Sequence, residues 1–207
     1  TPQLATRRSH VPRMGQRCEE QPRSRRRVLR YCWGVNSDAF ETAAADTTGV
    51  IVAFLRGIGI AVVPGRVPED AFLPGVRIAD GGLVYDPAAL RWPGDLLHEA
   101  GHIATTPAAQ RHQLSDDLAG QEALEQGGEI EATAWAYAAS VALGLDPRVL
   151  FHEGGYHGKS AGLVLTYGAG VYPGCKGLAD AGMTRIGDAA REHGVAPYPH
   201  MVRWLRG

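Results

Sequence analysis

Residues Leu96–Ala104, which read LLHEAGHIA, contain the motif from which the predicted fold and site of this chain follow. Within them, His98 and His102 enclose Glu99 in an H-E-x-x-H motif. In an α-helix, residues four positions apart lie about 40° apart around the axis and about 6 Å along it, so both imidazoles reach one metal ion. Glu99 lies about 100° from His98, where its carboxylate contacts a water beside the ion without being a ligand. The pattern predicts a Zn²⁺ site with His98 and His102 as ligands and Glu99 as the catalytic base.

A third protein ligand has to come from elsewhere in the chain. A catalytic zinc site has three protein ligands and one open position. No histidine follows at the spacing H-E-x-x-H-x-x-G-x-x-H, because Pro107 and Ala108 occupy that stretch. The carboxylates further along are Glu122, Glu125, Glu129 and Glu131. We therefore expect the third ligand to be one of these glutamates.

Glu129 is the better candidate among them. Glu129 and Glu131 belong to a predicted Ala-rich helix over residues 129–143, where two positions correspond to 200° of rotation, so at most one of them faces the metal. The bulky Trp135 follows on the Glu131 side. The Glu129 side continues with small residues that allow a close approach to the first helix: Ala132, Thr133, Ala136 and Ser140. We predict Glu129 as the third ligand and keep Glu131 as the alternative.

Short strands and helices flank the motif, which predicts an α+β fold. Helical spacing of apolar residues after a capping-type start predicts a helix over residues 46–56. β-Branched residues predict a strand over residues 60–63. Residues 76–79 and 83–85, separated by Asp-Gly-Gly, predict a β-hairpin or two short edge strands. A further helix is predicted over residues 115–126, after the metal-binding helix.

Residues His152–His157, which read HEGGYH, look like a second copy of the motif but differ in spacing. Their histidines are five positions apart, about 140° around a helix, and the two glycines favour a loop. Tyr156, His152 or His157 is a candidate to line the cleft and to hydrogen-bond a tetrahedral intermediate; the alternative is an ordinary surface turn. Asp95 is expected to be a helix N-cap rather than a partner of the first motif histidine.

The composition is that of a globular protein with a sizeable core. The chain has 207 residues, of which 44% are hydrophobic and 21% charged, and 27 are glycines. These values exclude a fully disordered chain, a collagen-like repeat and a coiled coil. Three cysteines, none in a C-x-x-C pair, do not make a disulfide framework, so we expect a reducing, cytoplasmic location. No apolar stretch reaches the roughly 18 residues of a membrane span, so no membrane association is expected.

The net charge of −1 is a sum over two unlike parts. Residues 1–30 hold nine of the 21 Lys and Arg residues and two acidic ones, whereas the remaining residues carry 12 basic and 20 acidic side chains. The first part is predicted to be a disordered basic arm, and residues 31–207 a single catalytic domain with a C-terminal extension. Because no aromatic side chains lie between the arginines, we do not expect nucleic-acid binding.

The order of these segments resembles the ImmA/IrrE family of zinc metallopeptidases. In that family an H-E-x-x-H helix is followed by a helix reading roughly E-x-x-A-N-x-F-A-A, and residues 129–138 here read EIEATAWAYA. Thr133 replaces the usual Asn, and Leu145-Asp146-Pro147 replaces a usual L-M-P ending. The resemblance covers about residues 46–146. It implies a zincin-like domain, a Zn²⁺ cofactor, Glu129 as the glutamate ligand, and cleavage of a regulatory protein.

Together these observations predict zinc-dependent hydrolysis of a peptide bond in a protein or peptide substrate. The fold is expected to hold a small twisted sheet beside the motif helix and a second, Glu-bearing helix. The strand over residues 83–85 is a candidate edge on which an extended peptide adds as a strand. The alternatives are a zinc hydrolase of a small amide or ester, and a non-catalytic metal-stabilised interaction domain. The oligomeric state stays open.

Overall fold

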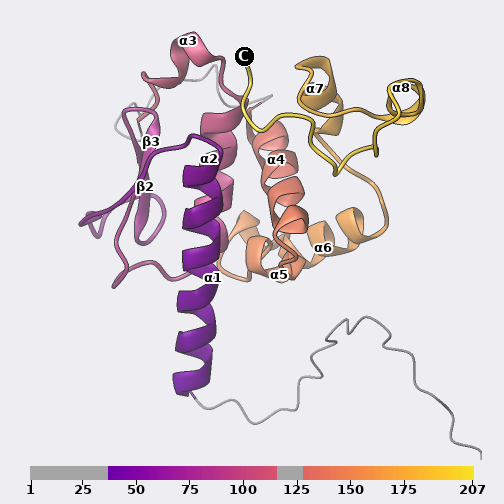
Figure 1. Ribbon diagram of the computed structural model, residues 1–207. Coiled ribbons are helices and arrows are strands. Elements are labelled where there is room, and N and C mark those ends of the chain that lie inside the picture. The colour runs from indigo at the N-terminus through magenta and orange to yellow at the C-terminus, as the bar shows by residue number, and fades with distance from the viewer. Residues whose placement is uncertain (1–36, 116–127) are drawn as a thin grey trace, which may run out of the picture. The chain divides into compact units, whose positions relative to one another are not determined.

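The computed structural model of the chain (Figure 1) describes residues 37–115 and 128–207, with side chains from Asp46 onward. The predicted basic arm, the helix predicted over residues 115–126, and the carboxylates Glu122 and Glu125 therefore lie outside the described residues, except for Ser115.

The elements follow one another as the predicted α+β class requires. The first half consists of α1 (Ser37–Gly57), β1 (Val62–Pro64), β2 (Val76–Ala79), β3 (Gly82–Tyr85), α2 (Gly94–Thr105) and α3 (Ala108–Arg111). The second half consists of α4 (Gly128–Ala142), α5 (Pro147–Leu150), the 3₁₀ helix η2 (Tyr156–Gly158), α6 (Ser160–Gly168), α7 (Cys175–Asp180) and α8 (Gly187–Glu192). The predicted fold class is confirmed: a small sheet lies beside two helices that carry the motif histidines and Glu129.

The sheet is mixed and has the strand order β1-β3-β2. β2 and β3 form the predicted hairpin, with Ile78 opposite Leu83, and its two-residue turn places Asp80 and Gly81 in the left-handed region. β1 runs parallel to β3, with Val62 opposite Leu83. The expectation that residues 83–85 form a sheet edge is therefore wrong, because β3 pairs on both sides and the edges are β1 and β2. The parallel pairing joins segments about twenty residues apart, which local patterns do not reveal.

The boundaries of α1 and β1 differ most from the prediction. α1 begins at Ser37 rather than near residue 46. Residues 37–45 include four alanines, which favour helix, and the polar residues after them continue the helix instead of starting it. β1 begins two residues later than predicted and includes Pro64, which is tolerated because β1 is an edge strand.

The described domain is layered around α2, which lies between the sheet and α4, while α7 and α8 lie on the far side of α4 (Figure 1). The α2–α4 contact is close because small residues meet there. A Cβ atom built on Gly101 would lie 2.5 Å from the backbone oxygen of Ala132. This is the close approach expected for the Glu129 side of α4. The short distance between α2 and α4 determines how far apart the polar side chains of the two helices lie.

Most of α4 is buried rather than one stripe of it. Ala134 and Tyr137 are buried, whereas Ile130 and Val141 near the two ends of the helix are 48% and 43% exposed. The middle of the helix is covered on all sides because α2, α5 and α7 all pack against it. An Ala-rich sequence suits this position, since small side chains let several neighbours approach one helix.

The C-terminal residues complete the core beside these two helices. The indole of Trp135 on α4 donates a hydrogen bond of 2.8 Å to the backbone oxygen of Trp204, and the two rings pack edge to face. The backbone N–H of Arg206 donates to the oxygen of Ala104 near the end of α2. The guanidinium of Arg111 donates to the oxygens of Ile103 and Arg206, so the end of α2 is satisfied by cationic groups.

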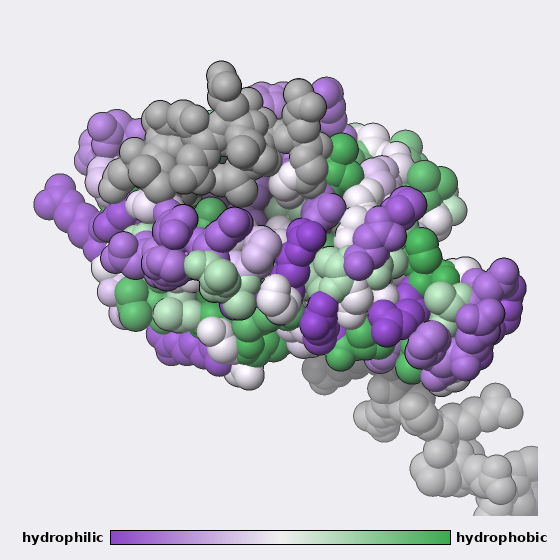
Figure 2. Space-filling view, turned by 90° about the horizontal axis from the view of Figure 1, so that it is seen from above, coloured by the Kyte–Doolittle hydropathy of each residue, from purple (hydrophilic) through white to green (hydrophobic). Residues whose placement is uncertain are grey.

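The surface mixes polar and apolar side chains. On the face seen in Figure 2, the hydrophobic residues form separate spots among hydrophilic ones. The most exposed large hydrophobic residues of the described chain are Phe72 (85%) and Leu165 (74%). Among the described helices, none is both long enough and apolar enough to cross a membrane.

Candidate metal centre

The motif helix α2 has one apolar and one polar face. Leu96, Leu97 and Ile103 are fully buried, which fixes the rotation of the helix about its axis. The opposite face then presents His98 and His102, whose side chains are 16% and 14% exposed. Burial of the apolar stripe therefore aims both imidazoles at the same space, as the spacing predicted.

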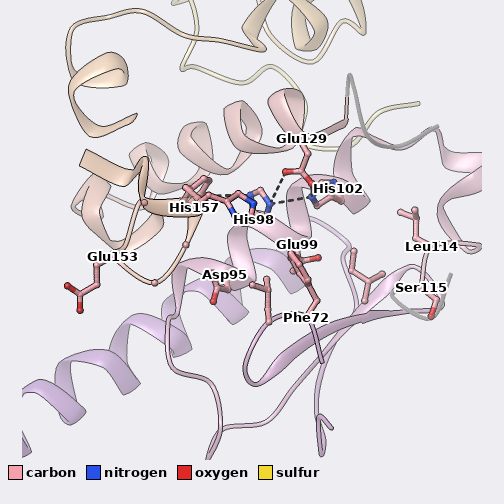
Figure 3. A pocket seen from close by; sticks show the side chains of 16 residues that line it. Phe72, Asp95, His98, Glu99, His102, Leu114, Ser115, Glu129, Glu153 and His157 are labelled. Carbon is pink, nitrogen blue, oxygen red and sulfur yellow. Dashed lines mark hydrogen bonds and ion pairs between the residues drawn. The ribbon is translucent and has the colours of Figure 1, made fainter. Parts of the chain in front are cut away.

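Three side chains converge at one point in this space (Figure 3). The Nε2 atoms of His98 and His102 lie 3.4 Å apart. Glu129 on α4 reaches both of them, with 3.4 Å from its Oε2 to His98 and 3.3 Å from its Oε1 to His102. These ligand atoms form a group that could hold a metal ion. The hydrogen bonds with His102 and with His98 lower the pKa of Glu129 well below its ordinary value, so its carboxylate is charged at neutral pH.

The group offers donor atoms that zinc accepts in proteins, namely two imidazole nitrogens and a carboxylate. The two Glu129 distances belong to different oxygens, because Oε2 faces His98 and Oε1 faces His102. Both oxygens of the carboxylate therefore lie beside the histidines, and an ion held there would have ligands from α2 and α4.

Glu131, the alternative ligand, faces away from this group. Its Oε2 lies 3.6 Å from Nη1 of Arg206, and its side chain packs against Gly177 of α7. The two glutamates therefore point to opposite sides of α4, as their 200° of helical rotation requires. Of the two candidates, the structure brings only Glu129 to the histidines.

Glu99 lies on α2 between the two histidines and lines the same pocket (Figure 3). It is 8% exposed, so its carboxylate is largely shielded from bulk water while its helix position keeps it beside the histidine group. A carboxylate in such a place is available to exchange a proton with a molecule in the pocket.

The pocket has a volume of about 570 Å³ and two unlike sides. One side is apolar and was not foreseen from the sequence; it comprises Phe72, Leu73, Ile78 and Leu114. The other side is the glycine-rich segment 153–158. Phe72 and Leu73 precede β2 in a segment without helical or strand periodicity, so no local pattern indicates that they face the metal group.

Only part of the HEGGYH segment contacts the metal-binding group. The hydroxyl of Tyr156 lies 3.5 Å from Nδ1 of His98, and the two rings pack edge to face with centres 5.6 Å apart. His157 is exposed and lines the pocket. His152 is buried, and its Nε2 lies 2.7 Å from Oδ1 of Asp95. Of the three candidates, Tyr156 contacts a motif histidine directly.

The expectation that Asp95 is a helix N-cap is wrong. α2 begins at Gly94, Pro93 is at the N-cap position, and no side chain caps this end. The Asp95 carboxylate turns instead to His152, 57 residues further along. Aspartate is a residue type that favours the N-cap position. In the folded chain, however, the Asp95 carboxylate pairs with His152 instead of the end of the helix.

Burial raises the pKa of Tyr156 well above its ordinary value, and the negative charge of Asp95 adds to this effect. The phenol therefore stays protonated at neutral pH. The phenol oxygen beside Nδ1 of His98 can accept that ring's N–H, which would leave the Nε2 lone pair to bind an ion held with His102 and Glu129.

No protein family, curated protein or solved structure matches this chain. The likeness to the ImmA/IrrE family therefore rests on the two motifs and on the arrangement of the His98, His102 and Glu129 side chains that they carry.

Proposed function

We propose that the protein is a zinc-dependent hydrolase that cleaves peptide bonds. The observation that carries the proposal is the group of His98, His102 and Glu129, whose ligand atoms lie close enough together to hold one metal ion, with Glu99 in the same pocket. The likeness of both motif helices to those of the ImmA/IrrE peptidases supports the same reading.

Each residue has a distinct part in the proposed reaction. His98, His102 and Glu129 would hold the ion. Zinc in such a site lowers the pKa of a water from about 15.7 towards 7 and polarises a substrate carbonyl. Glu99 accepts the proton of the water that attacks the scissile carbonyl, and then donates it to the leaving amine. Its low exposure keeps bulk water from competing for this proton.

The pocket favours an extended peptide over a compact small molecule. β2 is an edge strand and contributes Ile78 to the pocket wall. The apolar residues Phe72 and Leu114 would contact a large apolar side chain of such a substrate.

Iron(II) is the principal alternative ion, because two histidines and one carboxylate also form the facial triad of non-haem iron enzymes. The position of Glu99 between the two histidines favours zinc and hydrolysis, because its carboxylate lines the same pocket without belonging to the ligand group.

The test combines metal analysis with the substitution Glu99→Gln. We expect about one zinc per chain in both wild type and variant, because Glu99 is not a ligand. Peptidase activity on an unfolded protein substrate should fall by about 10²- to 10⁴-fold, because the amide cannot accept a proton. His98→Ala is the matched control and should lose the metal as well as the activity. Full activity in the Glu99 variant, or a full zinc content in the His98 variant, would overturn the proposal.

A further inference from the structure

Asp95 and His152 form a buried polar pair one helical turn before His98. Each is 5% exposed, and 2.7 Å separates His152 Nε2 from Asp95 Oδ1. The His152 ring stacks on Trp92, with centres 4.6 Å apart and an angle of 9° between the planes. Among the described residues, Asp95 Oδ2 and His152 Nδ1 have no hydrogen-bond partner.

Such a pair is a poor source of stability. Removing two polar groups from water is unfavourable, and the two unpaired atoms leave that loss only partly offset. An apolar pair of similar size would fill the same space without this loss. A function in positioning neighbouring groups explains the pair better than a contribution to stability.

His152 anchors the start of the turn that carries Tyr156. The hydroxyl of Ser160 donates a hydrogen bond of 2.5 Å to the backbone oxygen of His152, and the N–H of Gly155 donates to the same oxygen. A Cβ atom at Gly154 would lie 2.5 Å from Nε1 of Trp92. The glycine therefore lets the chain close around the stacked rings, so the position of the His152 ring dictates the path of the turn.

The turn itself is strained at the point where it meets the metal group. Tyr156 and His157 have φ angles of 55° and 51°, a left-handed conformation that non-glycine residues rarely adopt, and here two adopt it in succession. Such a conformation persists only where the surrounding structure enforces it. The buried Asp95–His152 pair and the Ser160 hydrogen bond are the constraints next to it.

The strained turn places Tyr156 against His98. The Tyr156 ring packs edge to face against both His98 and Phe151, and its hydroxyl lies 3.5 Å from His98 Nδ1. Asp95 thus reaches His98 through His152 and the turn that carries Tyr156.

We propose that Asp95 and His152 are positioning residues that hold Tyr156 against His98 and so direct Nε2 of His98 towards the metal. This inference rests on the proposed metal site. It assigns Tyr156 to orienting a ligand, in place of the part in stabilising an intermediate that the sequence suggested. Groups that orient a metal-bound histidine typically change metal affinity 10- to 100-fold.

The experiment measures zinc affinity by competition with a chromophoric chelator, and the absorption spectrum of the Co²⁺-loaded protein. The variants are Tyr156→Phe, the apolar pair Asp95→Leu/His152→Phe, and the triple variant. Tyr156→Phe and the apolar pair should each weaken zinc binding about 10- to 100-fold and alter the Co²⁺ bands. The triple variant should lie within about threefold of Tyr156→Phe, because the pair acts through Tyr156.

Tyr167→Phe is the matched control. Tyr167 is buried, contacts Phe151 as Tyr156 does, and also loses one hydrogen bond on substitution, in its case to the oxygen of Pro173. It does not touch His98 in the structure, so zinc affinity and the Co²⁺ spectrum should stay as in wild type. With zinc removed from both proteins, thermal unfolding of the apolar pair should occur at or above the wild-type temperature.

Three outcomes would overturn the inference. The first is wild-type zinc affinity in the apolar pair, and the second is a loss of zinc affinity in the triple variant equal to the product of the two separate losses. The third is a loss of zinc affinity in Tyr167→Phe as large as that in Tyr156→Phe. If the apolar pair does not fold, the isosteric Asp95→Asn takes its place, and unchanged zinc affinity in that variant overturns the inference as well. A wild-type protein that binds no zinc contradicts the proposed function itself. If the wild type binds zinc and the variants bind it with the same affinity, only the inference about positioning is contradicted.

Discussion

Glu129 and Glu131 stand two positions apart on α4 and meet different chemistry. Glu129 lies 3.3–3.4 Å from two imidazole nitrogens, whereas Glu131 lies 3.6 Å from a guanidinium nitrogen of Arg206. For single residues, the function of a carboxylate thus depends on the side of the helix from which its side chain projects. This difference leads to a pair of matched substitutions.

Glu129→Ala should weaken zinc binding by about 100-fold or more, because it removes a direct ligand, whose loss is greater than that of an outer partner. Glu131→Ala should leave zinc affinity unchanged and lower the free energy of unfolding by at most about 1 kcal/mol, since its ion pair with Arg206 is partly exposed. Isothermal titration with Zn²⁺ measures the first effect and chemical denaturation the second. Zinc loss confined to Glu131→Ala would contradict the assignment.

At the scale of elements, the decisive feature is the close contact of α2 with α4. Two ligands come from one helix and the third from the other, so the distance between the helices sets the size of the ligand group. Gly101 makes this distance short, because no side chain separates it from the Ala132 backbone. The same packing that buries the core therefore shapes the candidate metal centre.

Gly101→Ala should push the two helices apart. The added methyl group would lie 2.5 Å from a backbone oxygen, so we expect a loss of about 1–3 kcal/mol in the free energy of unfolding and weaker zinc binding. Gly49→Ala in α1 is the control, because nothing lies within 4 Å of its added Cβ. It should stabilise the protein by about 0.5–1 kcal/mol and leave zinc affinity as in wild type. Equal effects of the two substitutions would show that the helix contact does not govern the site.

At the scale of the whole molecule, a metal ion would connect parts of the chain that lie far apart in the sequence. α2 contacts the sheet and α1, α4 contacts α5 and α7, and the C-terminal residues contact both helices. An ion held by both helices would therefore stabilise the folded domain as a unit.

Removal of zinc with a chelator should lower the temperature of unfolding. An ion present at about 100 times its Kd contributes about 2.7 kcal/mol to the free energy of unfolding. For a domain of this size that corresponds to a shift of roughly 5–10 °C. Calorimetry before and after chelation measures the shift, and added Zn²⁺ should restore it. In the Glu129→Ala variant the chelator should change little, and an equal shift there would point to a different site.

Local patterns in the sequence predict the features that depend on neighbouring residues. The four-residue spacing of His98 and His102 places both rings on one side of a helix whatever the rest of the chain does. The turn Asp80-Gly81 likewise suits a two-residue hairpin, and small residues after Glu129 indicated a close helix contact. The α+β class and the likeness to a zinc peptidase follow from these local patterns.

Tertiary structure alone decided which distant groups meet. The choice between Glu129 and Glu131, the central place of β3, and the turn of Asp95 towards His152 all depend on contacts between segments far apart in the chain. Helical spacing fixes directions only within a few residues. Once the chain folds, burial of the apolar faces rotates and places each element, and that packing selects the partner of each polar side chain.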